Sequence, residues 1–211
     1  MKIEDMNSHT IHGRGVDSPD AIVQYVMHSG GVLLQAKNDF FDVALPLATC
    51  EIRGIGLAKP KLKLPTLPIS FLKTIIEHAR RYPHEVVYYI IRNEDVGTMQ
   101  LVVGKHGTAV SIDDLVDPYP DSQIVAQIHS HHSMGAFFSA TDNAADQEFR
   151  LYGVVGRTNY TIPHVAFRLG VHGYHFDLNV SAIFDDALDE LSDVCSDTFG
   201  DNDNYLRGDL E

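Results

Sequence analysis

Residues 86–91, with the sequence VVYYII, limit what this chain can fold into more than any other segment. A run in which every residue is β-branched or aromatic is typical of a strand buried on both faces. Such a strand lies inside a sheet and needs other elements packed above and below it. We therefore expect residues 86–91 to form a central strand of a layered fold.

Residues 69–83, ISFLKTIIEHARRYP, show the clearest helical pattern in the chain. Ser70 is the expected N-cap, and Arg80 and Arg81 are expected in the last turn before Pro83 ends the helix. Apolar residues recur at intervals of three and four positions and predict one buried stripe, formed by Ile69, Leu72, Ile75, Ile76 and Ala79.

The rest of the chain adds mostly strands. Two apolar segments, 21–27 and 31–36, are separated by a short turn sequence and predict a hairpin. Residues 139–152 have the composition of a second helix. Because helices interleave with strands, and many neighbouring strands are joined by short turns, the expected fold class is α/β with a mixed sheet flanked by helices. Further strands are expected within 42–58, 99–104, 109–112, 124–131, 152–156, 164–171 and 174–178.

These patterns divide the chain into three regions. Residues 1–68 are an N-terminal strand-rich segment that ends in a connector with three prolines between positions 60 and 68. Residues 69–186 carry the helix and the central strand and are expected to form the main domain. Residues 187–211 are acidic and low in apolar residues, so we expect a disordered tail.

Charge and cysteine content exclude several classes of protein. The formal net charge of −13 argues against a surface that binds nucleic acid, which is normally basic. Cys50 and Cys195 form neither a CxxC pair nor a disulfide framework, so reduced thiols are expected. No stretch approaches the roughly 18 apolar residues of a membrane span, and no signal peptide is recognisable. We expect a cytoplasmic protein with no nucleic-acid or membrane partner.

Residues 128–142, IHSHHSMGAFFSATD, contain the candidate site. Side chains two positions apart on a strand point the same way, so His129 and His131 are expected to face one point. Ser139 is a typical helix N-cap, which would place Asp142 in the first helical turn near the end of that strand. Two imidazoles and one carboxylate are the protein ligands of a catalytic zinc ion that keeps its fourth position for water. We expect one Zn²⁺ per chain.

A purely structural explanation competes with this hypothesis: the histidines would flank a turn, and Ser139 and Asp142 would only cap a helix. Capping explains the S-x-x-D spacing. It does not explain paired histidines at the end of an apolar strand, so the metal hypothesis is favoured. His132 is expected on the opposite strand face, outside the ligand set. His84 is not expected to be a ligand, because Tyr88 replaces the second histidine of an HExxH motif.

Other residues near these positions have less specific expectations. Three apolar loop residues would either form a rim for an extended peptide or pack in the core, which is the commoner fate of such side chains: Met134, Phe137 and Phe138. Three later histidines are expected to be surface or packed residues rather than ligands: His164, His172 and His175. Ser130 is expected to have a structural role.

The spacing H-S-H-x7-S-x-x-D resembles the JAMM motif of the JAB1/MPN/Mov34 metalloprotease family. The resemblance extends from about Ile69 to Phe184, and the helix and strand of TIIEHARRYPHEVV are similar to those of that family. The segments AFFSATD, FRLYGVVGR and VAFRLGVHGYHFDL resemble its bacterial, often plasmid-borne branch, in particular protein A of the PRTRC system. The fold that this resemblance implies is an MPN/JAB domain, which is related to the cytidine deaminase fold.

The resemblance also implies a zinc hydrolase with a glutamate upstream of the motif as its general base. The residue that matches this position is Glu85. Many family members have a glycine shortly after the glutamate, whereas residues 86–88 are Val-Val-Tyr here, so Glu51 and Glu94 stay open as alternatives. The family mechanism further implies that the Ser139 hydroxyl helps to stabilise the oxyanion.

By the same resemblance, the expected activity is that of a deubiquitinase-like (iso)peptidase, which cleaves a ubiquitin-like protein or its conjugate after the C-terminal glycine. An E1-like activating enzyme is a further partner that the bacterial branch implies. Two alternatives stay open: a non-catalytic MPN scaffold, and a zinc hydrolase acting on another small amide or a thiocarboxylate. A nucleoside deaminase is excluded, because the chain has neither the H-x-E nor the P-C-x-x-C motif.

Overall fold

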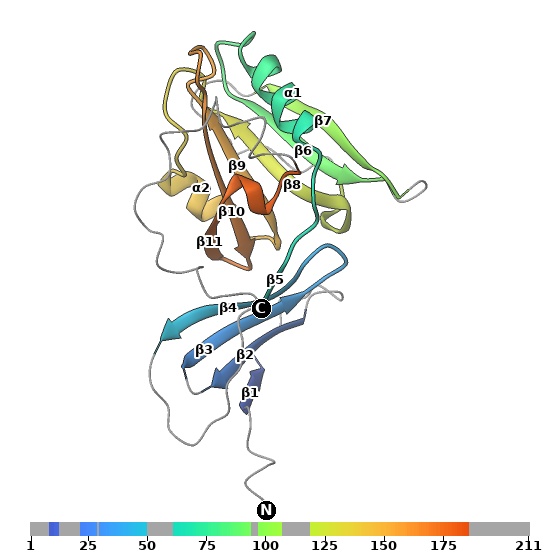
Figure 1. Ribbon diagram of the computed structural model, residues 1–211, viewed down its shortest axis with the longest axis vertical. Helices are drawn as coiled ribbons and strands as arrows, with labels where there is room; N and C mark the ends of the chain where they lie inside the picture. The colour runs from blue at the N-terminus through green and yellow to red at the C-terminus, as the bar shows by residue number, and fades with distance from the viewer. Residues whose placement is uncertain are drawn as a thin grey trace, which may run out of the picture. The chain divides into compact units, whose positions relative to one another are not determined.

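The computed structural model describes residues 9–12, 22–28, 30–49, 61–93, 97–106 and 119–185. The chain contains two compact units, Met1–Pro65 and Thr66–Glu211 (Figure 1). Several predicted features lie outside the described residues: the strand at 109–112, the cysteines Cys50 and Cys195, and the acidic tail 187–211.

The N-terminal unit is a five-stranded antiparallel sheet of β1 (His9–His12), β2 (Ile22–His28), β3 (Gly31–Lys37), β4 (Asp42–Thr49) and β5 (Lys61–Lys63), in that order. The register of β2 and β3 runs from Ile22 opposite Lys37 to His28 opposite Gly31, which confirms the predicted hairpin. Buried residues from the three central strands pack into one cluster: Val26, Leu33 and Ala44.

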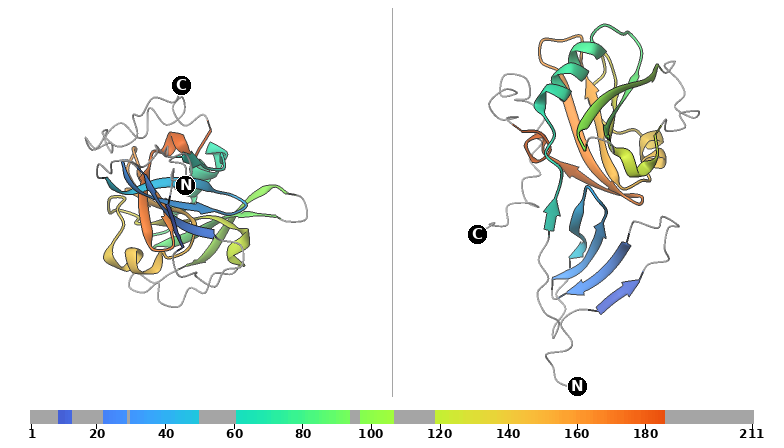
Figure 2. Two further views of the ribbon diagram at one scale, coloured as in Figure 1. Left: turned by 90° about the horizontal axis from the view of Figure 1, so that it is seen from below. Right: turned by 90° about the vertical axis from the view of Figure 1, so that its right-hand side faces the viewer.

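The second unit is built on a six-stranded sheet in the order β11-β10-β9-β8-β6-β7. The β8–β9 pair is parallel, and the other pairs are antiparallel. The helices α1 (Ile69–Ala79) and α2 (Ala140–Ala145) lie on opposite sides of the sheet (Figure 2), so the predicted mixed sheet flanked by helices is confirmed. The strands are β6 (Val86–Arg92), β7 (Met99–His106), β8 (Ile124–Ser130), β9 (Arg150–Gly156), β10 (His164–Val171) and β11 (Tyr174–Leu178).

Strand β6 is buried on both faces, as its sequence predicts. On one face Tyr88 reaches α1, where its hydroxyl lies 3.0 Å from Nδ1 of His78. On the other face Val87, Tyr89 and Ile91 pack with Ile124 of β8. Strands β7 and β8 pair with its two edges. The backbone and side chains of β6 are thus enclosed by neighbouring elements.

Helix α1 buries the predicted apolar stripe, but its ends differ from the prediction. The N-cap is Pro68 and not Ser70, which lies inside the first turn. Pro68 has an extended backbone and offers no capping side chain; instead the Ile69 N–H donates to Oδ1 of Asp185 at 2.7 Å. A partner 116 positions away replaces the local cap that sequence rules favour.

The C-terminal end of α1 also corrects a prediction. The last helical residue is Ala79, so Arg80 is the C-cap and Arg81 follows the helix. The Nε of Arg80 donates to the carbonyl oxygen of Thr158 at 2.9 Å, and its Nη2 lies within hydrogen-bond distance of the Tyr160 carbonyl. The Arg80 side chain therefore binds the β9–β10 loop, while its backbone N–H donates to the Ile76 carbonyl at the helix end.

Helix α2 is shorter than the predicted segment 139–152. It ends at Ala145, and β9 already begins at Arg150. At the C-cap, Asp146 has left helical geometry, and its carboxylate binds Arg168 of β10 at 2.6 Å. A contact with a distant strand thus ends a helix that composition alone would continue.

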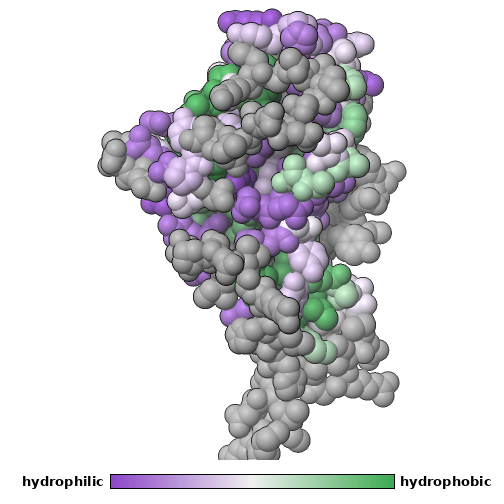
Figure 3. All heavy atoms as spheres, turned by 180° about the vertical axis from the view of Figure 1, so that it is seen from behind, coloured by the Kyte–Doolittle hydropathy of each residue, from purple (hydrophilic) through white to green (hydrophobic). Residues whose placement is uncertain are grey.

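Within the described residues, no helix is long and apolar enough to cross a membrane. Figure 3 shows hydrophilic side chains spread over the face in view, with apolar side chains in smaller areas between them.

Replacing Asp185 with alanine is expected to lower the free energy of unfolding by about 1 kcal/mol, because the Ile69 N–H loses its partner at the helix N-terminus. Urea unfolding followed by circular dichroism measures this change. Asp177→Ala is the matched control, since Asp177 is exposed on β11. Equal losses in the two variants would contradict the role assigned to Asp185.

Candidate metal centre

Strand β8 presents the two histidines of the site. Its register places His129 opposite Val87 of β6 and beside Val154 of β9. Although β8 ends at Ser130, the His131 N–H still donates to the Val155 carbonyl at 2.8 Å, so the backbone remains held beyond the last strand residue. Both rings therefore point to the same side, as the i, i+2 spacing predicts, and their Nε2 atoms are 3.1 Å apart.

The carboxylate of the site comes from α2. Ser139 is its N-cap, as predicted, and Oγ of Ser139 accepts a hydrogen bond from the Asp142 N–H at 3.2 Å. In return, the Ser139 N–H donates to Oδ2 of Asp142 at 2.6 Å, which completes a capping box. One carboxylate oxygen is thus engaged by the backbone. The other, Oδ1, lies 3.6 Å from Nε2 of His129.

His129, His131 and Asp142 form a buried group whose candidate ligand atoms all lie within 4.8 Å of one another. A tetrahedral zinc ion with Zn–N bonds of about 2.05 Å holds its ligand atoms about 3.3 Å apart. The separations of 3.1 Å between the Nε2 atoms and 3.6 Å from His129 to the carboxylate lie on either side of that value. The donor set and its spacing fit one such ion.

The orientation of the His131 ring is set by a backbone carbonyl. Its Nδ1 lies 3.1 Å from the Gly135 oxygen. Because a carbonyl oxygen only accepts, Nδ1 carries the hydrogen, and Nε2 of the neutral ring keeps its lone pair. The hydrogen bond to Gly135 therefore selects the tautomer that can bind a metal through Nε2.

Burial and charge set the protonation of two of the candidate ligands, His129 and Asp142. Burial lowers the pKa of His129 from 6.5 to about 4, although the nearby Asp142 carboxylate acts in the opposite direction. Burial alone would raise the pKa of Asp142, but the hydrogen bond from Ser139 and the charge of His129 outweigh it and lower that pKa. The imidazole of His129 is thus neutral, and the Asp142 carboxyl ionised, at neutral pH.

Glu85 lies just before β6 and close to this group. Its Oε1 is 4.0 Å from Nε2 of His131, and its side chain is 28% exposed. The neighbouring Val86 N–H donates to Oγ of Ser130 at 3.0 Å, so the serine between the two histidines fixes the chain next to Glu85. Burial raises the pKa of Glu85, the charge of His131 lowers it, and the charge of Asp142 raises it, with a net increase. A partly buried carboxylate at this distance is suited to accept a proton near the metal position.

The other glutamates considered from the sequence, Glu51 and Glu94, lie outside the described residues. His84 is exposed. Neither His84 nor His132 belongs to the candidate metal group found among the described residues. His132 has a positive φ of 43°, and its Nδ1 is buried without a hydrogen-bond partner.

The loop residues expected to pack in the core behave differently from one another. Met134 is 50% exposed and Phe137 is 49% exposed, so of the two alternatives core packing does not hold for either residue. The Phe137 ring stands edge-on to His131 with centroids 4.8 Å apart, which brings an exposed aromatic surface next to a candidate ligand. Phe138 instead stacks under the guanidinium of Arg168, whose carbon Cζ lies 3.8 Å from the centroid of the Phe138 ring.

The late histidines lie outside the metal group of the described residues. Nε2 of His164 is 3.0 Å from Nη1 of Arg157. His172 packs near the Phe149 ring, with centroids 6.0 Å apart. His175 donates through Nε2 to the Asp146 carbonyl at 2.8 Å.

Sequence reasoning missed Gly156, which shapes the loop beside His131. A Cβ at this position would lie 2.4 Å from the Met134 oxygen and 2.4 Å from the Gly135 carbonyl carbon. Only glycine lets the loop approach β9 this closely. The signal was present, since a glycine inside an apolar strand pattern often marks a close backbone approach.

Comparison with known proteins gives two findings. Residues 68–169 match the family model described as prokaryotic homologs of the JAB domain. Among solved structures, the chain is similar to a JAB1/MPN domain protein from Archaeoglobus fulgidus at 16% sequence identity, with a TM-score of 0.39 and coverage of 57% of this chain and 98% of that chain. A search of curated proteins finds no match.

We expect the stability of the metal-free protein to fall as pH is lowered from about 6.5 to about 4. In this window an unfolded chain binds a proton at His129, whereas the folded chain, with its pKa lowered to about 4, does not. Protons therefore favour the unfolded state. Thermal midpoints measured across this window should fall less steeply in His129→Gln than in the parent protein. His84→Gln, at an exposed position, is the control and should keep the parent slope.

Proposed function

The chain belongs to the JAB domain family through residues 68–169, and on this premise we propose that it is a zinc-dependent (iso)peptidase of the JAMM type. The observation that carries the proposal is the convergence of His129, His131 and Asp142 on one point, with Glu85 4.0 Å from His131. Two imidazoles and one carboxylate leave a coordination position for water, as catalytic zinc sites do.

When bound by these three side chains, a zinc ion would activate a water molecule as a nucleophile and polarise the scissile carbonyl. The protein contributes the geometry. The β8 backbone fixes the two imidazoles, and the capping box of α2 fixes the carboxylate.

Glu85 is the proposed general base. Its carboxylate accepts a proton from the attacking water and then donates that proton to the leaving amine. The raised pKa supports the first of these steps, because it makes the carboxylate a stronger base toward the proton of the water.

Ser139 is proposed to stabilise the oxyanion. Its Oγ already accepts the N–H of Asp142, and that bond uses an oxygen lone pair. The hydroxyl hydrogen, which also bonds the Asp142 carboxylate, would turn from that carboxylate to donate to a developing negative charge. In this proposal one side chain both positions a ligand and contacts the substrate.

The proposed substrate is a ubiquitin-like protein, cleaved after its C-terminal glycine at an isopeptide bond or a short extension. An E1-like activating enzyme is a proposed partner in the same pathway. The exposed side chains of Met134 and Phe137 beside His131 support a peptide substrate, since they offer an apolar rim along which an extended tail can lie.

Glu85→Gln is expected to lower turnover by two to four orders of magnitude, because the amide cannot accept the proton of the water. The substrate is a ubiquitin-like protein extended by a short peptide after Gly-Gly, and cleavage is followed by mass spectrometry with and without a chelator. Zinc content, measured by elemental analysis, should equal that of the parent protein.

Glu77→Gln is the matched control for this measurement. Glu77 is exposed on α1 of the same unit and should tolerate the change with parent-like turnover. Normal turnover of Glu85→Gln would remove Glu85 from the mechanism. Zinc binding by a parent protein that cleaves neither amides nor thiocarboxylated carriers would favour the non-catalytic scaffold.

Asp142→Ala is expected to abolish stoichiometric zinc binding, because it removes one of three ligand groups. Asp177→Ala again serves as the control and should retain the metal. Elemental analysis of the two purified variants after dialysis against zinc gives the result. Full zinc occupancy in Asp142→Ala would contradict the assigned ligand set.

A further inference from the structure

We propose that Arg168 is a positioning residue that holds α2, and with it Asp142, at the metal centre. This inference rests on the part of the proposed function that concerns metal binding, and it does not depend on catalysis. It assigns to β10 a part in metal binding that the motif on β8 and α2 does not contain.

Helix α2 has little of its own to keep it in place. It comprises six residues, well below the length at which an isolated helix is stable in water. Its buried residue is Asp142, so no apolar stripe fastens it to the sheet. Contacts from other elements have to fix its position.

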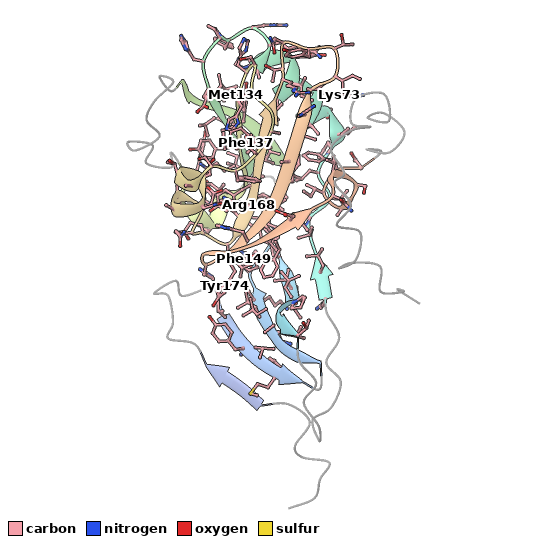
Figure 4. The ribbon with its side chains drawn as sticks, turned by 90° about the vertical axis from the view of Figure 1, so that its left-hand side faces the viewer. Lys73, Met134, Phe137, Phe149, Arg168 and Tyr174 are labelled. Atoms are coloured by element: carbon pink, nitrogen blue, oxygen red, sulfur yellow. The ribbon has the colours of Figure 1, made fainter. Side chains whose placement is uncertain are left out.

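Arg168 supplies such contacts before, within and after the helix. Its guanidinium carbon lies 3.8 Å from the centroid of the Phe138 ring, directly before the N-cap. Its Nη1 donates to Oδ1 of Asn143 at 2.5 Å, and its Nη2 donates to Oδ2 of Asp146 at 2.6 Å. Figure 4 shows Arg168 beside α2, with Phe137 and Met134 further along the same side.

These contacts lead directly to the ligand. Asn143 is the next residue after Asp142, and the Asp146 N–H donates to the Asp142 carbonyl at 2.8 Å. The Asp146 carbonyl is in turn bound by Nε2 of His175 at 2.8 Å. Movement of Asp146 would therefore shift the backbone that carries the Asp142 carboxylate.

The chemistry of the side chain suits this task. Arg168 is 3% exposed, and its charge is balanced by the buried carboxylate of Asp146. A planar guanidinium can bond two acceptors and stack on a ring at once, which a lysine ammonium cannot do. We therefore expect Arg168→Lys, which keeps the charge but loses the fork, to resemble Arg168→Met.

The test measures metal affinity of the full chain, independently of catalysis. Metal-free protein is titrated with Zn²⁺ in competition with a chromophoric chelator. Arg168→Met and Arg168→Lys should bind zinc 10- to 100-fold more weakly than the parent protein, the usual effect of losing a group that orients a ligand. The visible absorption bands of the Co²⁺-substituted protein should change in shape, which a uniform loss of stability would not cause.

Arg150→Met is the matched control. Arg150 is 1% exposed on the neighbouring strand β9, and its Nη1 donates to Gln127 of β8 at 3.3 Å. Its loss also removes a buried guanidinium, so it should lower the thermal midpoint while leaving zinc affinity and the Co²⁺ spectrum as in the parent.

Asp146→Asn provides a second, milder variant in case Arg168→Met does not fold. Asp146→Asn should also weaken zinc binding. In the double variant with Arg168→Lys, the fold-loss in zinc affinity should be smaller than the product of the two single fold-losses, because both substitutions act through one contact. Parent-like zinc affinity and Co²⁺ spectra in the folded variants would overturn the proposal.

Failure of the two proposals can be told apart. A parent protein that binds zinc but cleaves no substrate refutes the proposed function and leaves the Arg168 measurement valid. A parent protein that binds zinc and cleaves substrate, with unchanged zinc affinity in the Arg168 and Asp146 variants, refutes only the inference about Arg168. A parent protein that binds no zinc overturns both.

Discussion

The pairing of β6 with β8 is the constraint on which the candidate site depends. Val87 lies opposite His129 in this antiparallel register, so the residue two positions earlier, Glu85, is brought across from His131. A slip by one residue would turn either the glutamate or both histidines to the other side of the sheet. Burial of β6 on both faces opposes such a slip, because each alternative register would mismatch packed side chains. The hydrophobic core and the relative placement of the proposed base and ligands are therefore parts of the same structural solution.

A second constraint comes from the parallel pairing of β8 with β9. Parallel neighbours need a crossover connection, and here that connection contains α2 with the candidate ligand Asp142. The histidines stand at the carboxyl end of β8, where open α/β sheets commonly place their ligands. The site thus combines three kinds of support: a strand ladder for the imidazoles, a capped helix for the carboxylate, and a strand start for Glu85. Each support is modest alone. Ser130 bonds the start of β6 at Val86, Ser139 bonds Asp142 within α2, and Arg168 bonds Asp146 at the end of α2.

Local patterns in the sequence predict much of this arrangement. The buried strand, the stripe on α1, the Ser139 cap and the convergence of the two histidines with Asp142 all follow from patterns within short continuous segments of the chain. The errors arise where a distant residue decides. At the start of α1, Asp185 binds the Ile69 N–H in place of the cap expected from Ser70. The Arg80 side chain binds the Thr158 carbonyl in the β9–β10 loop. At the end of α2, Asp146 binds Arg168 of β10. The exposure of Met134 and Phe137 likewise depends on how the loop passes over β9, where Gly156 permits close approach. No periodicity encodes these long-range contacts.

The hydrogen bond from His131 to the Gly135 carbonyl has a consequence for how the centre acquires its ion. With Nδ1–H held by that carbonyl, a neutral His131 already offers its Nε2 lone pair to an incoming cation. His129 is kept neutral by its lowered pKa, and Asp142 is kept ionised. An arriving cation would thus displace no proton from the Asp142 carboxylate or from Nε2 of His129 near pH 7, in contrast to thiolate sites, which must first ionise. At these two groups, acidity would therefore compete little with the ion across the neutral range.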